Sequence, residues 1–306
     1  MIFAKNYDNN PVILKEEKEK TILKSNFPCE YPESSKIPLY IYNANSDKTL
    51  LFIHGLGTKN LKYLKWFPEN FAKNGYNSAL MILPYHFDRT PKGYKSGELF
   101  LSTTNNEILR SRFEHSVVDT LTTLNYLKER FSKKLFLMGF SFGGMVSTIA
   151  ASLRDDIKGL SLAVTGGNFY HITWKSFVTG VLRVQYEENK ECNPEKCLNY
   201  HIKEYPEYLR NLNNPDIELD KAPIACFEYD PSTFAKFIKS PTIIFRALFD
   251  IFIPKKSTLD LYERIKAKKE LYNIPSGHLS SYVFKRYILK KTIRFFDNII
   301  LYDKKI

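Results

Sequence analysis

A serine stands at the centre of a G-x-S-x-G pattern, GFSFG at 139–143. The apolar run KKLFLM (133–138) precedes it, and apolar residues at helical spacing follow it. A sharp turn between a strand and a helix holds such a serine in a strained backbone conformation and leaves its hydroxyl exposed, while the flanking glycines relieve clashes. We therefore predict that Ser141 is a nucleophile.

A serine hydroxyl needs a base near neutral pH, and the base needs an orienting carboxylate. His278 follows an apolar run and lies in the sequence PSGH (275–278), where a glycine frees the loop to position an imidazole. Asp250 closes the apolar run PTIIFRALFD (241–250), at the expected carboxyl end of a strand. We predict that His278 is the base and that Asp250 orients it, with Asp230 as the weaker alternative carboxylate.

Backbone N–H groups are the expected donors to the oxyanion of a tetrahedral intermediate. The sequence HGLG (54–57) ends the run TLLFI and lets the backbone approach a ligand, which predicts Leu56 N–H as one donor. Phe142 N–H is the other, because it begins the helix that follows the serine. His54 begins this loop, and we interpret it as a structural hydrogen-bonding residue rather than as the base.

The remaining histidines do not occupy comparable positions. His86 follows a predicted strand and is a candidate to border the pocket, whereas structural roles are expected for His115, His171 and His201. Cys192, Cys197 and His201 form a C-x4-C-x3-H sequence, which offers only three metal ligands at an unusual spacing. We therefore predict no metal and no cofactor, and whether these three residues bind anything stays open.

From residue 49 onward, short apolar runs alternate with amphipathic segments, as in a mostly parallel sheet covered by helices on both faces. Segments before residue 45, such as IPLYIYN (37–43), are predicted to be antiparallel edge strands. The predicted central strands cover 49–55, 77–86, 133–141, 159–167, 241–250 and 269–278. The predicted helices cover 59–73, 110–131, 143–154, 255–267 and 279–298.

One interval is too long for a single crossover between parallel strands. Residues 168–240 contain aromatic and aliphatic residues in helix-like order, which predicts a folded insertion rather than a linker. We predict a core formed by residues 1–167 and 241–306, with residues 168–240 as a helical lid.

The sequences HGLG, GFSFG, FDIFIP (249–254) and PSGH, in this order, resemble the α/β-hydrolase superfamily, and the resemblance covers roughly residues 37–300. Within it, the chain is similar to single-domain esterases and to prolyl-oligopeptidase-like and dienelactone-hydrolase-like enzymes. The resemblance implies an eight-stranded, mostly parallel sheet and a cofactor-free acyl-enzyme mechanism. It also implies a variable lid after the sixth strand, which corresponds to residues 168–240.

The amino-acid composition argues against several other classes of function. The chain has 306 residues, of which 43% are hydrophobic, and a formal net charge of +12. Its lysines are interleaved with acidic residues and asparagine rather than gathered with aromatic residues, so we expect no nucleic-acid partner. No signal peptide and no membrane span is predicted, and the few, irregularly spaced cysteines fit a reducing compartment; we expect a cytoplasmic protein.

These features predict a serine hydrolase that cleaves a carboxylic ester of a small-molecule acyl substrate. An acyltransferase or a peptidase with the same three residues stays open, as do the substrate and the oligomeric state. A rival from another class is a non-catalytic binding protein of this fold at a membrane surface, because residues 284–291 are basic and apolar. Peripheral membrane association therefore also stays open.

Overall fold

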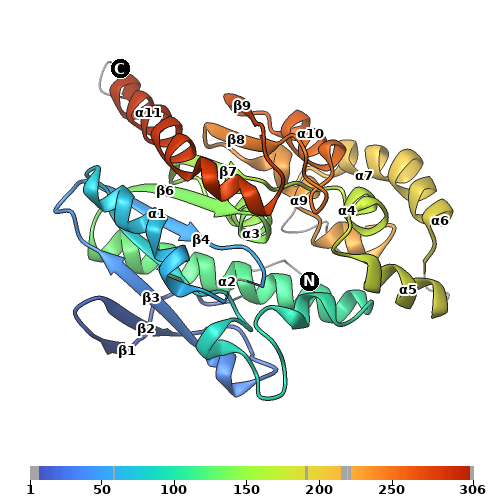
Figure 1. The fold of residues 1–306 in the computed structure, drawn as a ribbon, viewed down its shortest axis with the longest axis horizontal. Helices are drawn as coiled ribbons and strands as arrows, with labels where there is room; N and C mark the ends of the chain where they lie inside the picture. Colours follow the sequence, from blue (N-terminus) through green and yellow to red (C-terminus); the bar gives the residue numbers. More distant parts are fainter. Residues whose placement is uncertain (1–6, 58, 190–191, 215–218, 220–221, 304–306) are drawn as a thin grey trace.

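The computed structural model describes residues 7–57, 59–189, 192–214, 219 and 222–303. Its strands form one nine-stranded sheet (Figure 1). In chain order they are β1 (Ile13–Glu16), β2 (Lys20–Lys24), β3 (Lys36–Tyr42), β4 (Lys48–Ile53), β5 (Asn77–Met81), β6 (Lys134–Phe140), β7 (Ile157–Ala163), β8 (Thr242–Ala247) and β9 (Lys269–Ile274).

The sheet order is β1-β2-β3-β5-β4-β6-β7-β8-β9. The pairs β1–β2, β2–β3 and β3–β5 are antiparallel, and all later pairs are parallel. The prediction of a mostly parallel sheet with an antiparallel edge is thus confirmed. The expected number of eight strands is wrong, because Ile13–Glu16 pairs with β2 as a short additional hairpin strand. The long insertion therefore follows the seventh strand of this sheet rather than the sixth.

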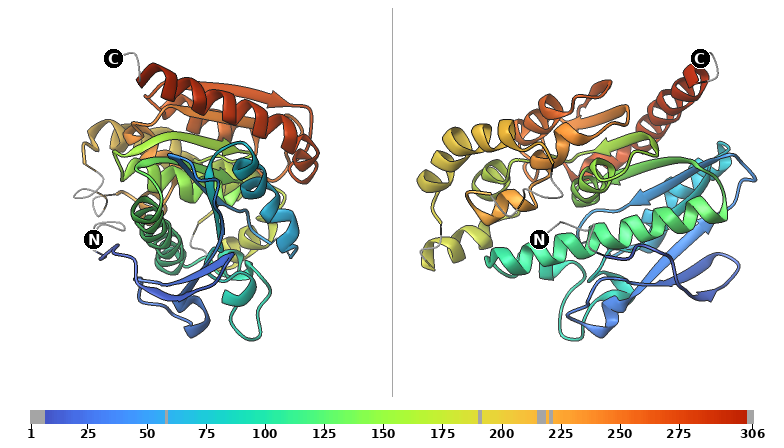
Figure 2. Two further views of the ribbon diagram at one scale, coloured as in Figure 1. Left: turned by 90° about the vertical axis from the view of Figure 1, so that its left-hand side faces the viewer. Right: turned by 180° about the vertical axis from the view of Figure 1, so that it is seen from behind.

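Helices cover both faces of the sheet, as predicted. The left view of Figure 2 shows α11 and α2 on opposite sides of it. Helices α1 and α11 pack on one face, and α2, α3 and α10 pack on the other. Their bounds are α1 (Leu61–Lys73), α2 (Asn106–Arg130), α3 (Phe142–Ser152), α10 (Lys255–Arg264) and α11 (Lys285–Asp303). Four short 3₁₀ turns accompany them: η1 (Pro32–Ser35), η2 (Phe87–Arg89), η3 (Glu98–Leu101) and η8 (Leu279–Phe284).

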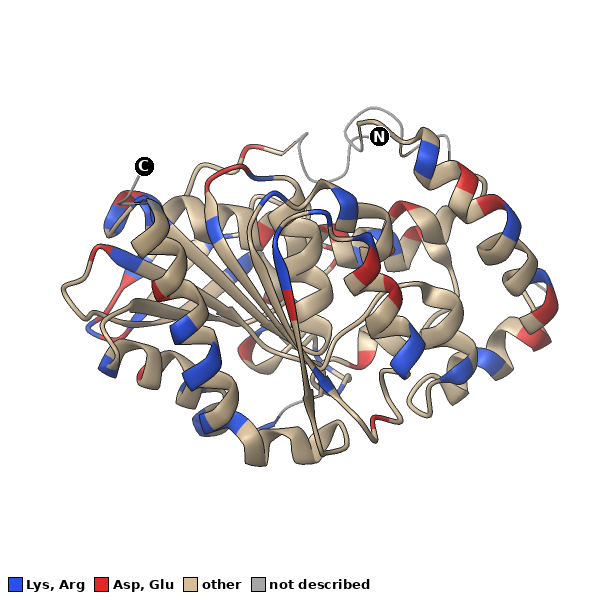
Figure 3. Ribbon diagram, turned by 90° about the horizontal axis from the view of Figure 1, so that it is seen from above, with Lys and Arg blue, Asp and Glu red and all other residues tan. Residues whose placement is uncertain are grey.

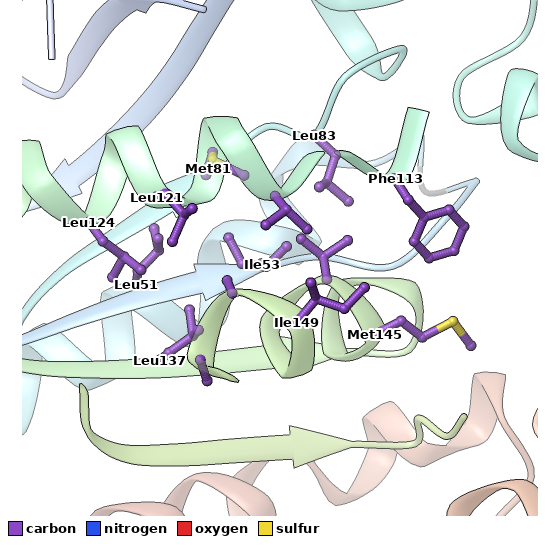
Figure 4. Packing of buried hydrophobic residues seen from close by; sticks show 14 of the residues in the cluster. Leu51, Ile53, Met81, Leu83, Phe113, Leu121, Leu124, Leu137, Met145 and Ile149 are labelled. Carbon is purple, nitrogen blue, oxygen red and sulfur yellow. The ribbon is translucent and has the colours of Figure 1, made fainter. Parts of the chain in front are cut away.

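The continuous apolar run of β4 reflects burial on two faces. Alternate side chains of a strand point to opposite sides, and Leu51 and Ile53 join the core beneath α2 and α3, whereas Leu50 and Phe52 join the core beneath α1 and α11. Figure 4 shows the first of these cores, with side chains of α2, β4 and α3 packed together. A strand with no solvated face must be central, and its carboxyl end opens onto the edge where ligand sites form.

The segment between β7 and β8 is largely helical in the described residues, and its helices gather at one end of the molecule (Figure 1). Residues 190–191, 215–218 and 220–221 of the predicted lid lie outside the described residues, and its separation from the core stays a prediction. The elements are α4 (Phe169–Lys175), α5 (Gly180–Glu188), α6 (Pro194–Asn199), η4 (Tyr200–Glu204), α7 (Tyr205–Asn211), η6 (Ala225–Glu228), α9 (Pro231–Phe234) and η7 (Ala235–Phe237).

A buried ion pair anchors the segment that follows β5. Arg89 and Asp119 are both almost fully buried, and Arg89 Nη2 lies 2.5 Å from Asp119 Oδ2. Arg89 also donates to the carbonyl oxygens of Ile82 and Ser34, at 2.8 and 2.6 Å. Burial opposes ionisation of Asp119, but Arg89 and its other hydrogen-bond partners outweigh it, so the pKa of Asp119 lies below its ordinary value. The pair thus joins α2, η2 and η1 through charges that have no access to water.

Replacing Arg89 by methionine is expected to lower the free energy of unfolding by about 3 kcal/mol or more, because it leaves the Asp119 carboxylate buried without its counter-ion. Urea unfolding measures the loss. Lys239→Met is the matched control, since the Lys239–Asp155 pair is exposed and should matter far less. Equal effects of the two substitutions would contradict a special contribution from the buried pair.

Candidate active site

Ser141 occupies the turn between β6 and α3 in a strained conformation, with φ 54° and ψ −121°. The turn lies very close to neighbouring backbone and side-chain atoms, and only residues without a Cβ fit at these contacts. A Cβ on Gly143 would lie 2.3 Å from the carbonyl oxygen of Ile53, and one on Gly55 would lie 3.0 Å from Ser141 Cβ. The glycines are therefore required because α3 packs directly against the end of β4.

The structure brings Ser141, His278 and Asp250 together, although they come from three separate loops. Ser141 Oγ lies 2.8 Å from His278 Nε2, and His278 Nδ1 lies 2.8 Å from Asp250 Oδ2. The side chains of His278 and Asp250 are 10% and 3% exposed. An ionised carboxylate only accepts hydrogen bonds, so Nδ1 carries the proton and Nε2 is free to accept from the serine hydroxyl.

The carboxylate of Asp250 is itself held in place. Its Oδ1 accepts hydrogen bonds from the backbone N–H groups of Phe252 and Ile253, both at 2.8 Å. These bonds close a tight turn after β8 and direct Oδ2 toward the imidazole. The orientation of the imidazole is thus determined by backbone geometry rather than by a mobile side chain.

Asp230, the alternative carboxylate, lies elsewhere in the fold. Its Oδ1 accepts from the N–H groups of Asn168 and Ser232, each at 2.8 Å, and its Oδ2 accepts from Phe169 N–H at 2.7 Å. It therefore caps the starts of α4 and α9. Burial raises the pKa of Asp230 to about 6. Its hydrogen bonds are structural, and none joins it to His278.

Both backbone groups that we predicted as oxyanion donors border the space in front of the serine. Phe142 is the first residue of α3, where an N–H group has no acceptor within its own helix. Leu56 follows β4 and lines the cavities on both sides of Ser141. The positive end of the α3 dipole lies at the same point, so an anion beside Ser141 is electrostatically favoured.

His54 has a structural position with a defined tautomer. Its side chain is fully buried, and Nε2 accepts a hydrogen bond from Leu83 N–H at 3.1 Å. The proton must then be on Nδ1, which lies 2.8 Å from the carbonyl oxygen of Gly55. Burial lowers the pKa of His54 to about 4, with the Gly55 hydrogen bond opposing the shift. A neutral His54 thus joins the HGLG loop to the end of β5.

A cavity of about 440 Å³ opens onto Ser141 and His278. Its wall combines residues of the core with residues of the 168–240 segment and is predominantly apolar. Charged residues in the described wall are restricted to Glu98 and Lys196, which are both exposed. Apolar residues that line the cavity include Phe100, Phe113, Met145, Trp174, Val178, Leu182, Phe252 and Leu279.

A smaller cavity of about 100 Å³ also opens onto Ser141, between the end of β4 and the start of η8.

The insertion, the Asp250 loop and η8 carry large apolar side chains that are exposed to solvent. Phe177 N–H donates to the carbonyl oxygen of Ile251 at 2.8 Å, which brings the insertion and the Asp250 loop together. Exposed apolar residues in these loops are Phe177, Val181, Phe249, Ile251, Leu279 and Val283. Sequence reasoning missed this rim and the cavity wall, because neither follows a recognisable motif.

The other histidines have different surroundings. His86, the candidate pocket residue, is fully buried and is absent from the walls of both cavities; a Cβ on Gly97 would lie 2.6 Å from its Nε2. His115 belongs to the network of Asp119 and is also fully buried. His201, in contrast, lines the large cavity together with Cys192 and Cys197. No group of three or more His, Cys, Asp or Glu side chains in the described part of the chain is arranged to hold a metal ion.

Basic residues are spread over the described part of the chain. Lys and Arg lie on helices throughout the ribbon, with Asp and Glu among them (Figure 3). The basic segment at 284–291 comprises the last residue of η8 and the start of α11, whose Ile288, Phe295 and Phe296 pack against the sheet. Of the helices in the described residues, none combines the length and the apolar character needed to cross a membrane.

Comparison with known proteins finds similarity only at the level of structure. No protein-family model and no curated protein sequence matches the chain. An α/β hydrolase from Penicillium sp. sh18 superimposes with a TM-score of 0.56 at 15% identity, over 86% of this chain and 94% of that one.

Two further structures show the same likeness. Acetyl xylan esterase 1 from Thermoanaerobacterium sp. JW/SL YS485 gives a TM-score of 0.56 at 15% identity, over 94% and 89% of the two chains. An acylaminoacyl peptidase from Pyrococcus horikoshii gives 0.58 at 16% identity, over 93% of this chain and 41% of that chain. The chain therefore has the α/β-hydrolase fold, as its sequence resemblance implied.

The buried neutral state of His54 makes stability depend on pH. Because its folded pKa is depressed, the unfolded chain binds the proton more readily, so the free energy of unfolding should fall as pH drops from about 6.5 toward 4. In His54→Asn this component, about 3 kcal/mol at most, should disappear. Urea unfolding at pH 4.5, 5.5 and 7 tests the slope, and an unchanged slope in the variant would refute the assignment.

Proposed function

We propose that this protein is a serine hydrolase that cleaves carboxylic esters through an acyl-enzyme intermediate. The observation that carries the proposal is the unbroken sequence of contacts from Ser141 Oγ through both nitrogens of His278 to Asp250 Oδ2. Three residues from separate loops meet in the order needed for proton transfer, and the serine among them has a strained backbone conformation.

In the proposed mechanism, Ser141 Oγ attacks the ester carbonyl carbon while His278 Nε2 takes its proton. Asp250 stabilises the imidazolium that forms, and the N–H groups of Leu56 and Phe142 donate to the oxyanion. The imidazolium then gives its proton to the departing alcohol. Water enters, loses a proton to His278 and attacks the acyl carbon. As the second tetrahedral intermediate collapses, the bond from Ser141 Oγ to the acyl carbon breaks, His278 returns its proton to Oγ, and the acid is released.

Two observations favour esters with a sizeable apolar group. The large cavity beside Ser141 is walled mainly by aromatic and aliphatic side chains. Leu279, which lines this cavity, is itself an exposed apolar residue. An ester is favoured over an amide because an alkoxide leaves more readily than an amine. Several structures that share the fold are named as esterases, which agrees with this choice.

A fluorophosphonate probe should label the protein at Ser141, because it forms a covalent bond to an activated serine. Ser141→Ala should abolish labelling, and Asp250→Asn should lower kcat for nitrophenyl esters by about 10⁴-fold, since it disturbs the tautomer of His278. Ser152→Ala is the matched control, because Ser152 lies at the opposite end of α3. Labelling that persists in Ser141→Ala would refute the proposed nucleophile.

The size of the substrate group should depend on Leu182, which lies on α5 and lines the large cavity. In Leu182→Trp, kcat/KM for nitrophenyl octanoate relative to nitrophenyl acetate should fall by about 10-fold or more, because the indole fills space otherwise open to methylene groups. Val184→Trp is the control on the same helix, since Val184 is exposed outside the cavity. An unchanged ratio in Leu182→Trp would show that the substrate group lies elsewhere.

A further inference from the structure

His201 is a buried polar residue that the proposed mechanism does not use. It lies in η4, a single π-helical turn that joins α6 to α7. In this turn Tyr205 N–H bonds to Tyr200 O, five residues earlier, and Pro206 follows in the first turn of α7. This wider turn places His201 at the wall of the large cavity.

His201 is 6% exposed, and aromatic rings surround its imidazole. Its ring centroid lies 5.1 Å from that of Tyr205, 5.0 Å from that of Phe227 and 6.1 Å from that of Tyr170. Neither Nδ1 nor Nε2 has a hydrogen-bond partner among the described residues. Folded proteins pair nearly all buried polar atoms, so a buried ring with two unpaired nitrogens at a cavity wall indicates an external partner.

Two other polar groups of the cavity wall have partners within the protein. Thr179 Oγ1 donates to the carbonyl oxygen of Ile172 at 2.7 Å, and the Tyr229 hydroxyl donates to Asn106 Oδ1 at 2.8 Å. The indole N–H of Trp174 at the same wall also lacks a hydrogen-bond partner in the described part of the chain, but it can only donate, whereas His201 also provides an acceptor in a mainly apolar cavity.

The imidazole is uncharged. Burial lowers the pKa of His201 to about 3, although the charge of Asp260 opposes the shift. Asp260 does not neutralise a charged His201, because its carboxylate is engaged by Arg264 at 2.8 and 2.9 Å. A neutral imidazole offers one donor and one acceptor, which a hydroxyl group can satisfy in either orientation.

We propose that His201 binds a hydroxyl group on the part of the ester that occupies the large cavity. The substrate class is thus an ester whose cavity-filling part is apolar but carries a hydroxyl, alcoholic or phenolic, at a distance from the scissile bond. This inference rests on the proposed hydrolase function and deepens it. A water molecule held by the ring is the alternative occupant, and it predicts no effect of His201 on substrate choice.

The test compares matched esters with and without the hydroxyl. One series carries the group in the acid, as nitrophenyl esters of ω-hydroxy and unsubstituted fatty acids of 4 to ~12 carbons. The other carries it in the alcohol, as acetates of the corresponding diols and alcohols. For each pair we compare kcat/KM of the hydroxylated ester with kcat/KM of the plain ester. For at least one chain length in either series, this ratio should be about 10-fold higher in the wild type than in His201→Phe.

Three variants separate hydrogen bonding from packing. His201→Phe keeps a ring among the aromatic neighbours but removes both polar nitrogens, and His201→Gln should restore part of the preference because its amide is neutral and hydrogen-bonding. His171→Phe is the control, because His171 belongs to the same insertion but does not line the cavity. An identical ratio in wild type and His201→Phe at every length would overturn the inference.

The experiments give different results if the role of His201 is wrong and if the proposed hydrolase function is wrong. Hydrolysis of the plain esters with no hydroxyl preference would refute only the role of His201. If no ester is hydrolysed and Ser141 takes no fluorophosphonate label, the hydrolase function falls. In that case calorimetric binding of the same esters to Ser141→Ala, with and without His201→Phe, still decides the hydroxyl site. Equal affinities would overturn it, and about 10-fold weaker binding of the hydroxylated ester in the double variant would support it.

Discussion

The site depends on the contact between the start of α3 and the end of β4. Gly143 lies so close to the Ile53 carbonyl that no side chain fits between them, and this contact holds Ser141 at a positive φ. Any retreat of α3 would relax the turn, withdraw the hydroxyl and separate the Phe142 N–H from the Leu56 loop. The surrounding residues stabilise this approach, because they bury both faces of β4 and nearly all of α3.

Much of this arrangement is readable from sequence, for physical reasons. Central strands such as β4 and β6 have no solvated face, so they appear as uninterrupted apolar runs, and glycines mark the points where backbones touch. The order of HGLG, GFSFG, Asp250 and His278 along the chain then indicates one edge of one sheet. What composition and periodicity could not supply was the extra strand β1, whose four residues are exposed and carry no pattern of burial.

The cavity was beyond sequence reasoning because its wall comes from residues that are distant in the chain and individually ordinary. Leu182 or Phe113 in a helical pattern is expected to pack against a core, and only the spacing of α5 from α2 decides whether such a residue borders a protein atom or open space. His201 shows the same limit of sequence reasoning. It is a candidate binding residue only because its ring nitrogens have no hydrogen-bond partner among the described residues.

The insertion therefore does more than cover the sheet. Asp230 ties its first helix, α4, to α9 near its end through three backbone N–H groups, and the bond from Phe177 to Ile251 joins it to the loop that carries Asp250. Because the insertion also supplies His201 and part of the apolar wall, its position helps to set the shape of the cavity, while the loops after β6, β8 and β9 hold Ser141, Asp250 and His278. The proposed reacting groups thus lie in the core, whereas the cavity in front of them is shared between the core and the insertion.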